Sequence, residues 1–154
     1  MSHRISTAAR LSFAIILTIL GGTLASAVTI DVDSGPEGNN IIAPGESWKF
    51  FKGTEPPSNP PDAWTAIDFD DSQWQIGPTG FGYGDNDDAT ILNDMQGNYV
   101  SVYIRKEFSD PVLSPDDVLT LEVDYDDGFI AYLNGAEVAR ANMPAGGVAG
   151  DFWE

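Results

Sequence analysis

Residues 129–140 read Phe-Ile-Ala-Tyr-Leu-Asn-Gly-Ala-Glu-Val-Ala-Arg, and this stretch decides the fold class. Asn134 and Gly135 stand between two runs that contain apolar and β-branched residues. A two-residue type I′ turn needs positive φ at both central positions, and Asn-Gly is the pair that supplies it most readily. The stretch therefore predicts an antiparallel β-hairpin with arms at residues 129–133 and 137–140.

The rest of the chain from Val28 onward also favours strands over helices. Leu119, Leu121 and Val123 alternate with polar residues, as in a strand with one buried face. No stretch keeps an apolar period near 3.6 residues, and glycine and proline are spread throughout. We expect an all-β fold, an antiparallel β-sandwich, with further strands at residues 28–32, 47–52, 99–108 and 118–125.

The N-terminal residues 1–27 have the composition of a secretory signal peptide. Arg4 and Arg10 precede the apolar run at residues 11–20, and Ala25-Ser26-Ala27 provides a small-residue cleavage site. The alternative is a membrane anchor, but the apolar run is shorter than the roughly 20 residues that span a bilayer. We expect cleavage after Ala27, a secreted chain with no membrane contact after cleavage, and a sandwich built without these residues.

Residues 53–98 are rich in turn-forming residues, and their first half contains Trp64, Phe69 and Trp74. Burial of these rings would hold the long connection against the sandwich. Trp64 and Trp74 would otherwise be free to stack on a sugar ring. We expect core packing, and we expect Asp70 or Asp71 to accept hydrogen bonds from backbone amides in a turn.

Several motifs in chain order resemble one family. They are Trp64 with residues 69–74 (Phe-Asp-Asp-Ser-Gln-Trp), residues 82–85 (Gly-Tyr-Gly-Asp), residues 103–108 (Tyr-Ile-Arg-Lys-Glu-Phe) and residues 125–142. This order resembles the galactose-binding-like jelly-roll modules of large secreted bacterial proteins of the planctomycete type. Those modules are distantly similar to the sugar-binding domain of β-galactosidase-type hydrolases. The resemblance covers about residues 46–145 and implies a jelly roll strongly but a ligand only weakly.

The family pattern continues with closing strands after the hairpin, whereas this sequence stops at residues 150–154. We therefore expect a signal peptide (1–27), an N-terminal strand and linker (28–45), and a sandwich (46–154) that lacks its closing strands. A complete minimal domain is the alternative. An incomplete sandwich would expose a sheet edge and part of its apolar interior.

Composition excludes several classes of function. With 24 acidic and 7 basic residues the formal charge is −17, and it becomes −19 once residues 1–27 are removed. Too few cations remain to neutralise nucleic-acid phosphates. The chain has no cysteine and one histidine, His3, which excludes thiolate metal sites, a cysteine nucleophile and a Ser–His–Asp triad.

The best candidate for a metal site is the acidic loop Asp85, Asn86, Asp87 and Asp88, which follows two glycines. Calcium prefers six to eight oxygen ligands in a flexible loop. The spacing of an EF-hand is absent, and turn formation by the Asp side chains is the alternative. Calcium is the one cofactor that the sequence suggests.

Candidate ligand-binding residues are the aromatics Tyr83 and Tyr99, which we expect to be exposed, and the cations Arg105 and Arg140. These arginines and Lys106 would otherwise pair with acidic residues on the sheet surface. A glycosidase needs two carboxylates across a cleft, one of them protonated, whereas most acidic residues here fall in turns. We expect no catalysis by this chain.

The sequence thus predicts a non-catalytic, secreted accessory module for carbohydrate or cell-surface recognition, with glycans or neighbouring domains as partners. One alternative is a structural spacer or interaction domain without a small-molecule ligand. A second is the N-terminal part of a secreted hydrolase whose catalytic domain lies elsewhere.

Overall fold

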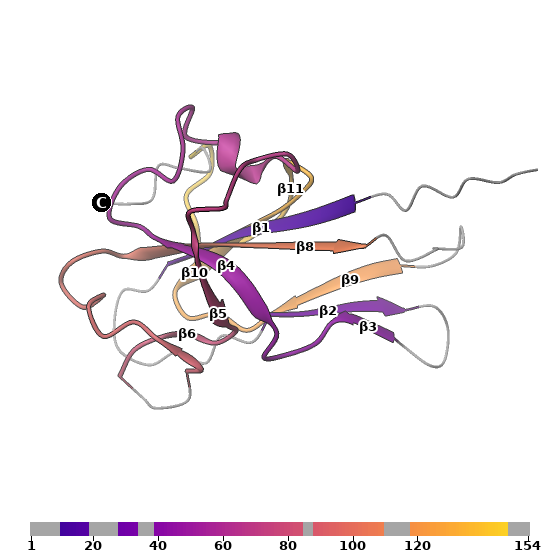
Figure 1. Cartoon of the computed structure of the whole chain (residues 1–154), viewed down its shortest axis with the longest axis horizontal. Helices are drawn as coiled ribbons and strands as arrows, with labels where there is room; N and C mark the ends of the chain where they lie inside the picture. The colour runs from indigo at the N-terminus through magenta and orange to yellow at the C-terminus, as the bar shows by residue number, and fades with distance from the viewer. Residues whose placement is uncertain (1–9, 19–27, 34–38, 85–87, 110–117, 148–154) are drawn as a thin grey trace, which may run out of the picture.

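The protein is an antiparallel β-sandwich (Figure 1), as the sequence predicts. The computed structural model describes residues 10–18, 28–33, 39–84, 88–109 and 118–147. Its elements are β1 (Arg10–Thr18), β2 (Val28–Asp33), β3 (Asn39–Ile42), β4 (Ser47–Lys52), the 3₁₀ turn η1 (Ala63–Thr65), β5 (Gln75–Pro78), β6 (Phe81–Gly82), β7 (Thr90–Ile91), β8 (Ser101–Ser109), β9 (Val118–Val123), β10 (Gly128–Leu133) and β11 (Ala136–Ala141). Within these ranges no helix has the length and apolar character of a membrane span.

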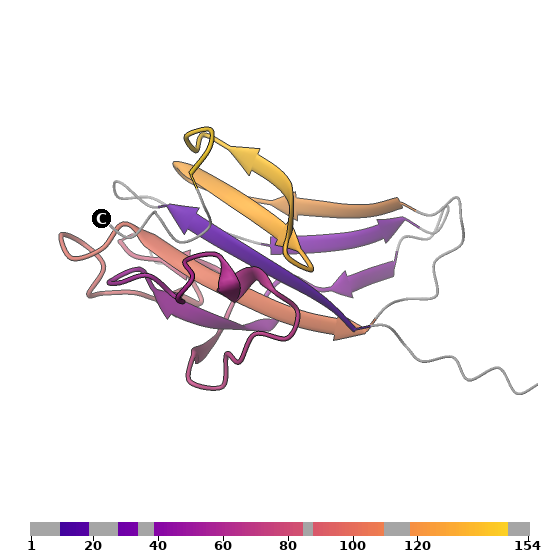
Figure 2. The ribbon, with the colours of Figure 1, turned by 90° about the horizontal axis from the view of Figure 1, so that it is seen from above.

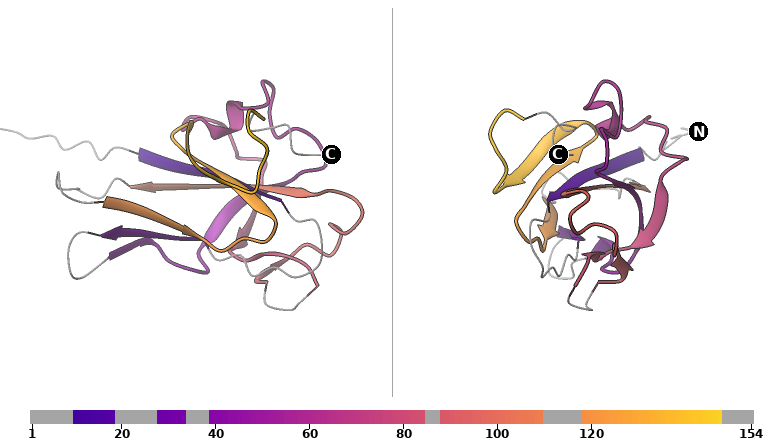
Figure 3. Two further views of the ribbon diagram at one scale, coloured as in Figure 1. Left: turned by 180° about the vertical axis from the view of Figure 1, so that it is seen from behind. Right: turned by 90° about the vertical axis from the view of Figure 1, so that its left-hand side faces the viewer.

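The larger sheet has six strands in the order β11-β10-β1-β8-β4-β5, and every neighbouring pair in it is antiparallel. A three-stranded sheet, β3-β2-β9, lies on one side of it (Figure 3, left). The short parallel pair β6–β7 forms a third, two-stranded sheet. The second sheet and the loops around β6 and β7 cover one face of the larger sheet.

The inner core lies between the two main sheets. Alternate residues of the larger sheet point into it, among them Phe13, Trp48 and Ile104, each at most 2% exposed. Leu119, Leu121 and Val123 of β9 pack against this core, while the intervening Thr120 and Glu122 are exposed. The alternation that the sequence shows in this segment is therefore confirmed.

A second core lies on the opposite, outer face of the larger sheet, under the loop that carries η1 (Figure 1). Trp64 is fully buried and Trp74 is 8% exposed. The Trp64 ring lies 6.1 Å from the Trp74 ring and 5.1 Å from that of Tyr103, between ring centroids. The expectation that these tryptophans hold the long connection by packing is confirmed.

The hairpin predicted from Asn134-Gly135 is present as β10–β11. Asn134 has φ 51° and Gly135 has φ 84°, the positive values that the turn requires. All six predicted strands are present, although their ends shift by up to a few residues. The sequence did not predict β3, β5, β6 or β7, which have only two to four residues each.

The largest departure from expectation is β1. The sequence predicts that residues 1–27 lie outside the sandwich, but Arg10–Thr18 forms a strand in the middle of the larger sheet, between β8 and β10 (Figure 2). Residues 12–17 are buried. A short uncharged apolar run suits a strand buried on both faces as well as it suits a leader, because both environments exclude water.

Candidate functional site

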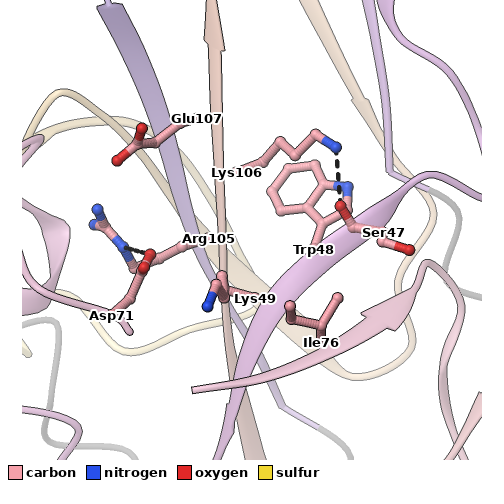
Figure 4. Close-up of a pocket in the computed structure, with 8 residues that line it drawn as sticks. All are labelled: Ser47, Trp48, Lys49, Asp71, Ile76, Arg105, Lys106 and Glu107. Atoms are coloured by element: carbon pink, nitrogen blue, oxygen red, sulfur yellow. Dashed lines mark hydrogen bonds and ion pairs between the residues drawn. The ribbon is translucent and has the colours of Figure 1, made fainter. Parts of the chain in front are cut away.

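A hollow of about 290 Å³ lies at the corner of the larger sheet formed by β5, β4 and β8 (Figure 4). It combines cationic, acidic and apolar side chains within a few strand spacings. The residues that line it are Ser47, Trp48, Lys49, Asp71, Ile76, Arg105, Lys106 and Glu107.

Strand register explains why three of these residues come together. Ile76 of β5 is opposite Lys49 of β4, and Lys49 is opposite Arg105 of β8. Residues directly opposite one another point to the same side of a sheet. Ile76, Lys49 and Arg105 therefore form one row across the outer face, and Ile76 is 66% exposed at its end.

Arg105 is the best-anchored residue of the site. Its side chain is fully buried, and Nε donates a 2.9 Å hydrogen bond to Oδ2 of Asp71 (Figure 4). Nη1 donates to the carbonyl oxygens of Trp64 and Ala66, the latter at 3.0 Å. The guanidinium carbon lies 5.4 Å from the centre of the Phe69 ring, so the loop that carries η1 encloses the charge on several sides.

This environment corrects part of the sequence-based expectation. Pairing of Arg105 with an acidic residue is confirmed, but the pair does not lie on an exposed sheet surface. The loop at residues 53–74 folds back over this strand, and its carbonyl groups replace the water that a surface arginine would bind. Asp70 instead forms the expected turn, since its Oδ1 accepts a 3.0 Å hydrogen bond from the backbone N–H of Ser72.

Lys49 differs from the other cations of the hollow. It is partly buried and forms no ion pair with any residue that the structure describes. Lys106, by contrast, lies 2.9 Å from Oε2 of Glu46 and donates a 2.8 Å hydrogen bond to the carbonyl of Ser47. The pKa of Glu46 is lowered, first by a hydrogen bond from the backbone N–H of Ala43 and then by Lys106. Lys49 is thus the cation most available to a ligand.

Both carboxylates of the hollow are engaged by arginines. Asp71 binds Arg105, and Glu107, which is exposed, pairs with Arg10 of β1. These contacts hold the elements of the sandwich together across long sequence separations. A two-carboxylate hydrolytic centre is therefore not the arrangement that the described residues of this hollow resemble.

The other candidate ligand-binding residues lie elsewhere. Tyr99 was expected to be exposed, but it is 5% exposed and its hydroxyl donates a 3.0 Å hydrogen bond to Oδ1 of Asp94. Burial, and secondarily Asp94, raises the pKa of Tyr99. Tyr83 is partly buried against the inner core. Neither tyrosine lines the hollow.

Arg140, on the edge strand β11, forms the surface ion pair that was the alternative to ligand binding. Its Nη2 lies 2.8 Å from Oε2 of Glu137. This contact raises the pKa of Arg140 and lowers the pKa of Glu137. Of the predicted ligand-binding residues, only Arg105 lines the hollow.

The predicted calcium loop is described only in part. Asp85, Asn86 and Asp87 lie outside the described residues, and Asp88 is buried with its carboxylate against the backbone of Gly82. Among the described residues there is no group of three or more His, Cys, Asp or Glu side chains that would hold a metal ion. Calcium binding stays a prediction.

No protein-family model matches the chain, and neither a curated protein nor a solved structure shows significant similarity to it. The function of the site is therefore inferred from its own geometry.

Sequence reasoning missed Lys49 and Ile76, because these residues become neighbours only through the pairing of β4 with β5. The one available indication was the Trp-Lys-Phe alternation at residues 48–50, which places Lys49 on the face opposite two core aromatics.

Proposed function

We propose that the chain is a non-catalytic, secreted recognition module that binds a carbohydrate at the hollow formed by β4, β5 and β8. The single observation that carries this proposal is the row of Ile76, Lys49 and Arg105 across the outer face. It places an exposed apolar side chain beside a lysine that is unpaired among the described residues and a rigidly held arginine.

The chemistry of the row suits a polyhydroxylated ligand. An ammonium group donates up to three hydrogen bonds, which sugar hydroxyl oxygens accept. Ile76 offers an apolar contact to the carbon face of a sugar ring. Asp71 and two backbone carbonyls engage Nε and Nη1 of Arg105, whereas its Nη2 is buried and forms no hydrogen bond with the described residues. Arg105 therefore holds the floor of the hollow in place.

A second function is favoured by the burial of the aromatic residues. Trp48, Trp64 and Trp74 are at most 8% exposed, so none of these described tryptophans offers a ring on which a sugar stacks. The exposed large apolar residues in the described ranges are aliphatic: Ile76, Ile91 and Val138. This supports the alternative of an interaction domain that binds polypeptide and orients neighbouring domains.

Substitution of Lys49 tests carbohydrate recognition. We expect the chain to bind at least one glycan on an array, and Lys49→Ala to weaken that binding at least tenfold, measured by titration calorimetry. The reason is that the substitution removes the available cation without touching either core. A tenfold loss corresponds to about 1.4 kcal/mol, close to the lower end of the range of about 1.5–3 kcal/mol for hydrogen bonds to a charged group.

Lys52→Ala is the matched control. Lys52 lies on the same strand, but it forms an ion pair with Asp94 at 2.7 Å and does not line the hollow. We expect this variant to bind like the unmodified chain. Carbohydrate recognition at this hollow would be refuted if the Lys49 and Lys52 variants had equal affinity, or if the unmodified chain bound no glycan. Either result would favour the second proposed function, an interaction domain that binds polypeptide.

A further inference from the structure

The central strand β1 is paired on both sides, so the larger sheet is continuous only when this strand is present. It pairs with β8 along its whole length, from Arg10 opposite Ser109 to Thr18 opposite Ser101. On its other side it pairs with β10, from Phe13 opposite Leu133 onward. Without it, β8 and β10 would each present an unpaired edge in the middle of the sheet (Figure 2).

The neighbouring strands cannot simply move together to fill this position. Because β1 is antiparallel to both, β8 and β10 run in the same direction. Direct contact would require a shift of about 4.8 Å, one strand spacing, and a parallel pair in an otherwise antiparallel sheet. Such a shift would also break the packing of Trp64, which contacts rings on both strands, Tyr103 and Tyr132.

The segment that fills this position is also the one whose composition predicts a cleaved leader. Arg10 is followed by an uncharged apolar run, and a small-residue cleavage pattern ends at Ala27. A strand in the centre of a sheet and a leader removed during export are mutually exclusive fates for one copy of the segment. Removal of residues 1–27 therefore creates a strand-sized vacancy between β8 and β10.

We propose that the space between β8 and β10 is a strand-acceptor site. In this structure the chain's own N-terminal segment fills it. In the processed chain it is filled by one extended segment of another polypeptide that adds as a β-strand. Main-chain hydrogen bonds supply affinity in this mode of recognition, and pockets for alternate side chains supply specificity. The part that concerns the processed chain rests on the export proposed above.

The contacts of β1 define the chemistry of the partner strand. Phe13, Ile15 and Leu17 point into the inner core and are at most 2% exposed, so the partner needs large apolar side chains at these alternate positions. Ala14 points to the outer core and is fully buried between Arg105 and Tyr132, so this position requires a small side chain.

Polar contacts at one end set the register of the partner. The backbone N–H of Ser12 donates a 2.9 Å hydrogen bond to Oδ1 of Asn134, and the N–H of Asn134 donates a 3.0 Å hydrogen bond to the carbonyl of Ser12. Arg10 pairs with Glu107 beside them. The expected partner is therefore an apolar strand with the length of β1, 9 residues, whose one charge is a cation at its N-terminal end. It runs antiparallel to both neighbours.

The test uses the full chain with a protease site inserted between residues 19 and 27, cut after purification. The cut chain is then unfolded in urea and refolded with an excess of a fluorescent peptide that has the sequence of residues 10–18 and a lysine tail. We expect the peptide to replace β1 with a stoichiometry of one per chain. A peptide carrying Ala14→Trp is expected to bind at least tenfold more weakly, although it is more apolar.

Two results would overturn the acceptor site: no incorporation of the peptide into the cut chain, or equal incorporation of the Ala14→Trp peptide, which indicates non-specific adsorption. A separate arm determines the N-terminus of the chain after export from a bacterial host. Recovery of a chain that starts at Val28 is expected. A folded exported chain that still starts at Met1 would overturn occupation by another polypeptide, whatever the peptide exchange shows.

Discussion

A chain that begins at Val28 is expected to show no cooperative unfolding transition, whereas the chain that contains β1 unfolds cooperatively. Four large apolar side chains of β1, those of Phe13, Ile15, Ile16 and Leu17, are at most 2% exposed. Burial of each contributes about 1.5–3 kcal/mol, so their loss removes roughly 6–12 kcal/mol. That is comparable to the whole stability of an ordinary domain, about 5–15 kcal/mol.

Thermal and urea unfolding followed by circular dichroism and tryptophan fluorescence measures this effect. The matched control begins at Arg10 and keeps β1 while lacking residues 1–9, and it is expected to unfold like the full chain. Of these chains, only the one that begins at Val28 is expected to bind a hydrophobic dye, because loss of β1 exposes apolar side chains of both cores. A cooperative transition with an unchanged midpoint in that chain would contradict a structural role for β1.

The second large effect is expected from Asp71→Ala. This substitution removes the carboxylate that accepts the Nε hydrogen bond of Arg105, while the guanidinium stays buried. Breaking a buried ion pair by removing one partner costs about 3–5 kcal/mol. Because the side chain of Asp71 is 18% exposed, water partly screens the pair, and we expect a loss of about 3 kcal/mol in the free energy of unfolding.

Asp70→Ala is the control for this measurement. Asp70 is adjacent in the sequence and exposed. Its carboxylate accepts the local hydrogen bond from Ser72 and, as a lesser contribution, is attracted to Lys49. We expect a much smaller loss of stability than for Asp71→Ala, because Asp70 is exposed and water replaces the turn contact. If urea titrations give the same loss for both variants, Asp71 does not anchor Arg105 to the loop in the way described above.

Much of the sandwich follows from local sequence patterns. The Asn134-Gly135 hairpin depends on backbone preferences that act within a few residues, so it could be predicted without knowledge of the rest of the chain. The same holds for β9, where apolar and polar residues alternate. Burial of Trp64 and Trp74 could be expected because large rings in a long connection rarely stay in water.

The strand β1 could not be predicted from its own composition. Its apolar run has no alternation, because it is buried on both faces, and it lies next to leader-like basic and small residues. Periodicity does not distinguish such a run from a leader segment. Tertiary structure determines that this run forms a strand, because the neighbouring strands β8 and β10 both offer hydrogen-bonding edges at that position.

The candidate site was predictable only in part. Arg105 could be selected as one of few cations, but its burial depends on how residues 53–74 return across the sheet. Lys49 and Ile76 become neighbours through strand pairing that no local pattern encodes. The sequence favours Tyr99 as an exposed aromatic platform, yet its ring is part of the inner core and its hydroxyl donates a hydrogen bond to Asp94.

The central claim is that residues 10–18 close the sandwich as its middle strand, and hydrogen–deuterium exchange of the full chain tests it most directly. Amide hydrogens of β1 are expected to exchange as slowly as those of β8, and more slowly than those of the edge strand β11, because strands on both sides satisfy its backbone. Exchange of residues 10–18 at the rate of an unfolded peptide, with β8 and β10 still protected, would contradict the account.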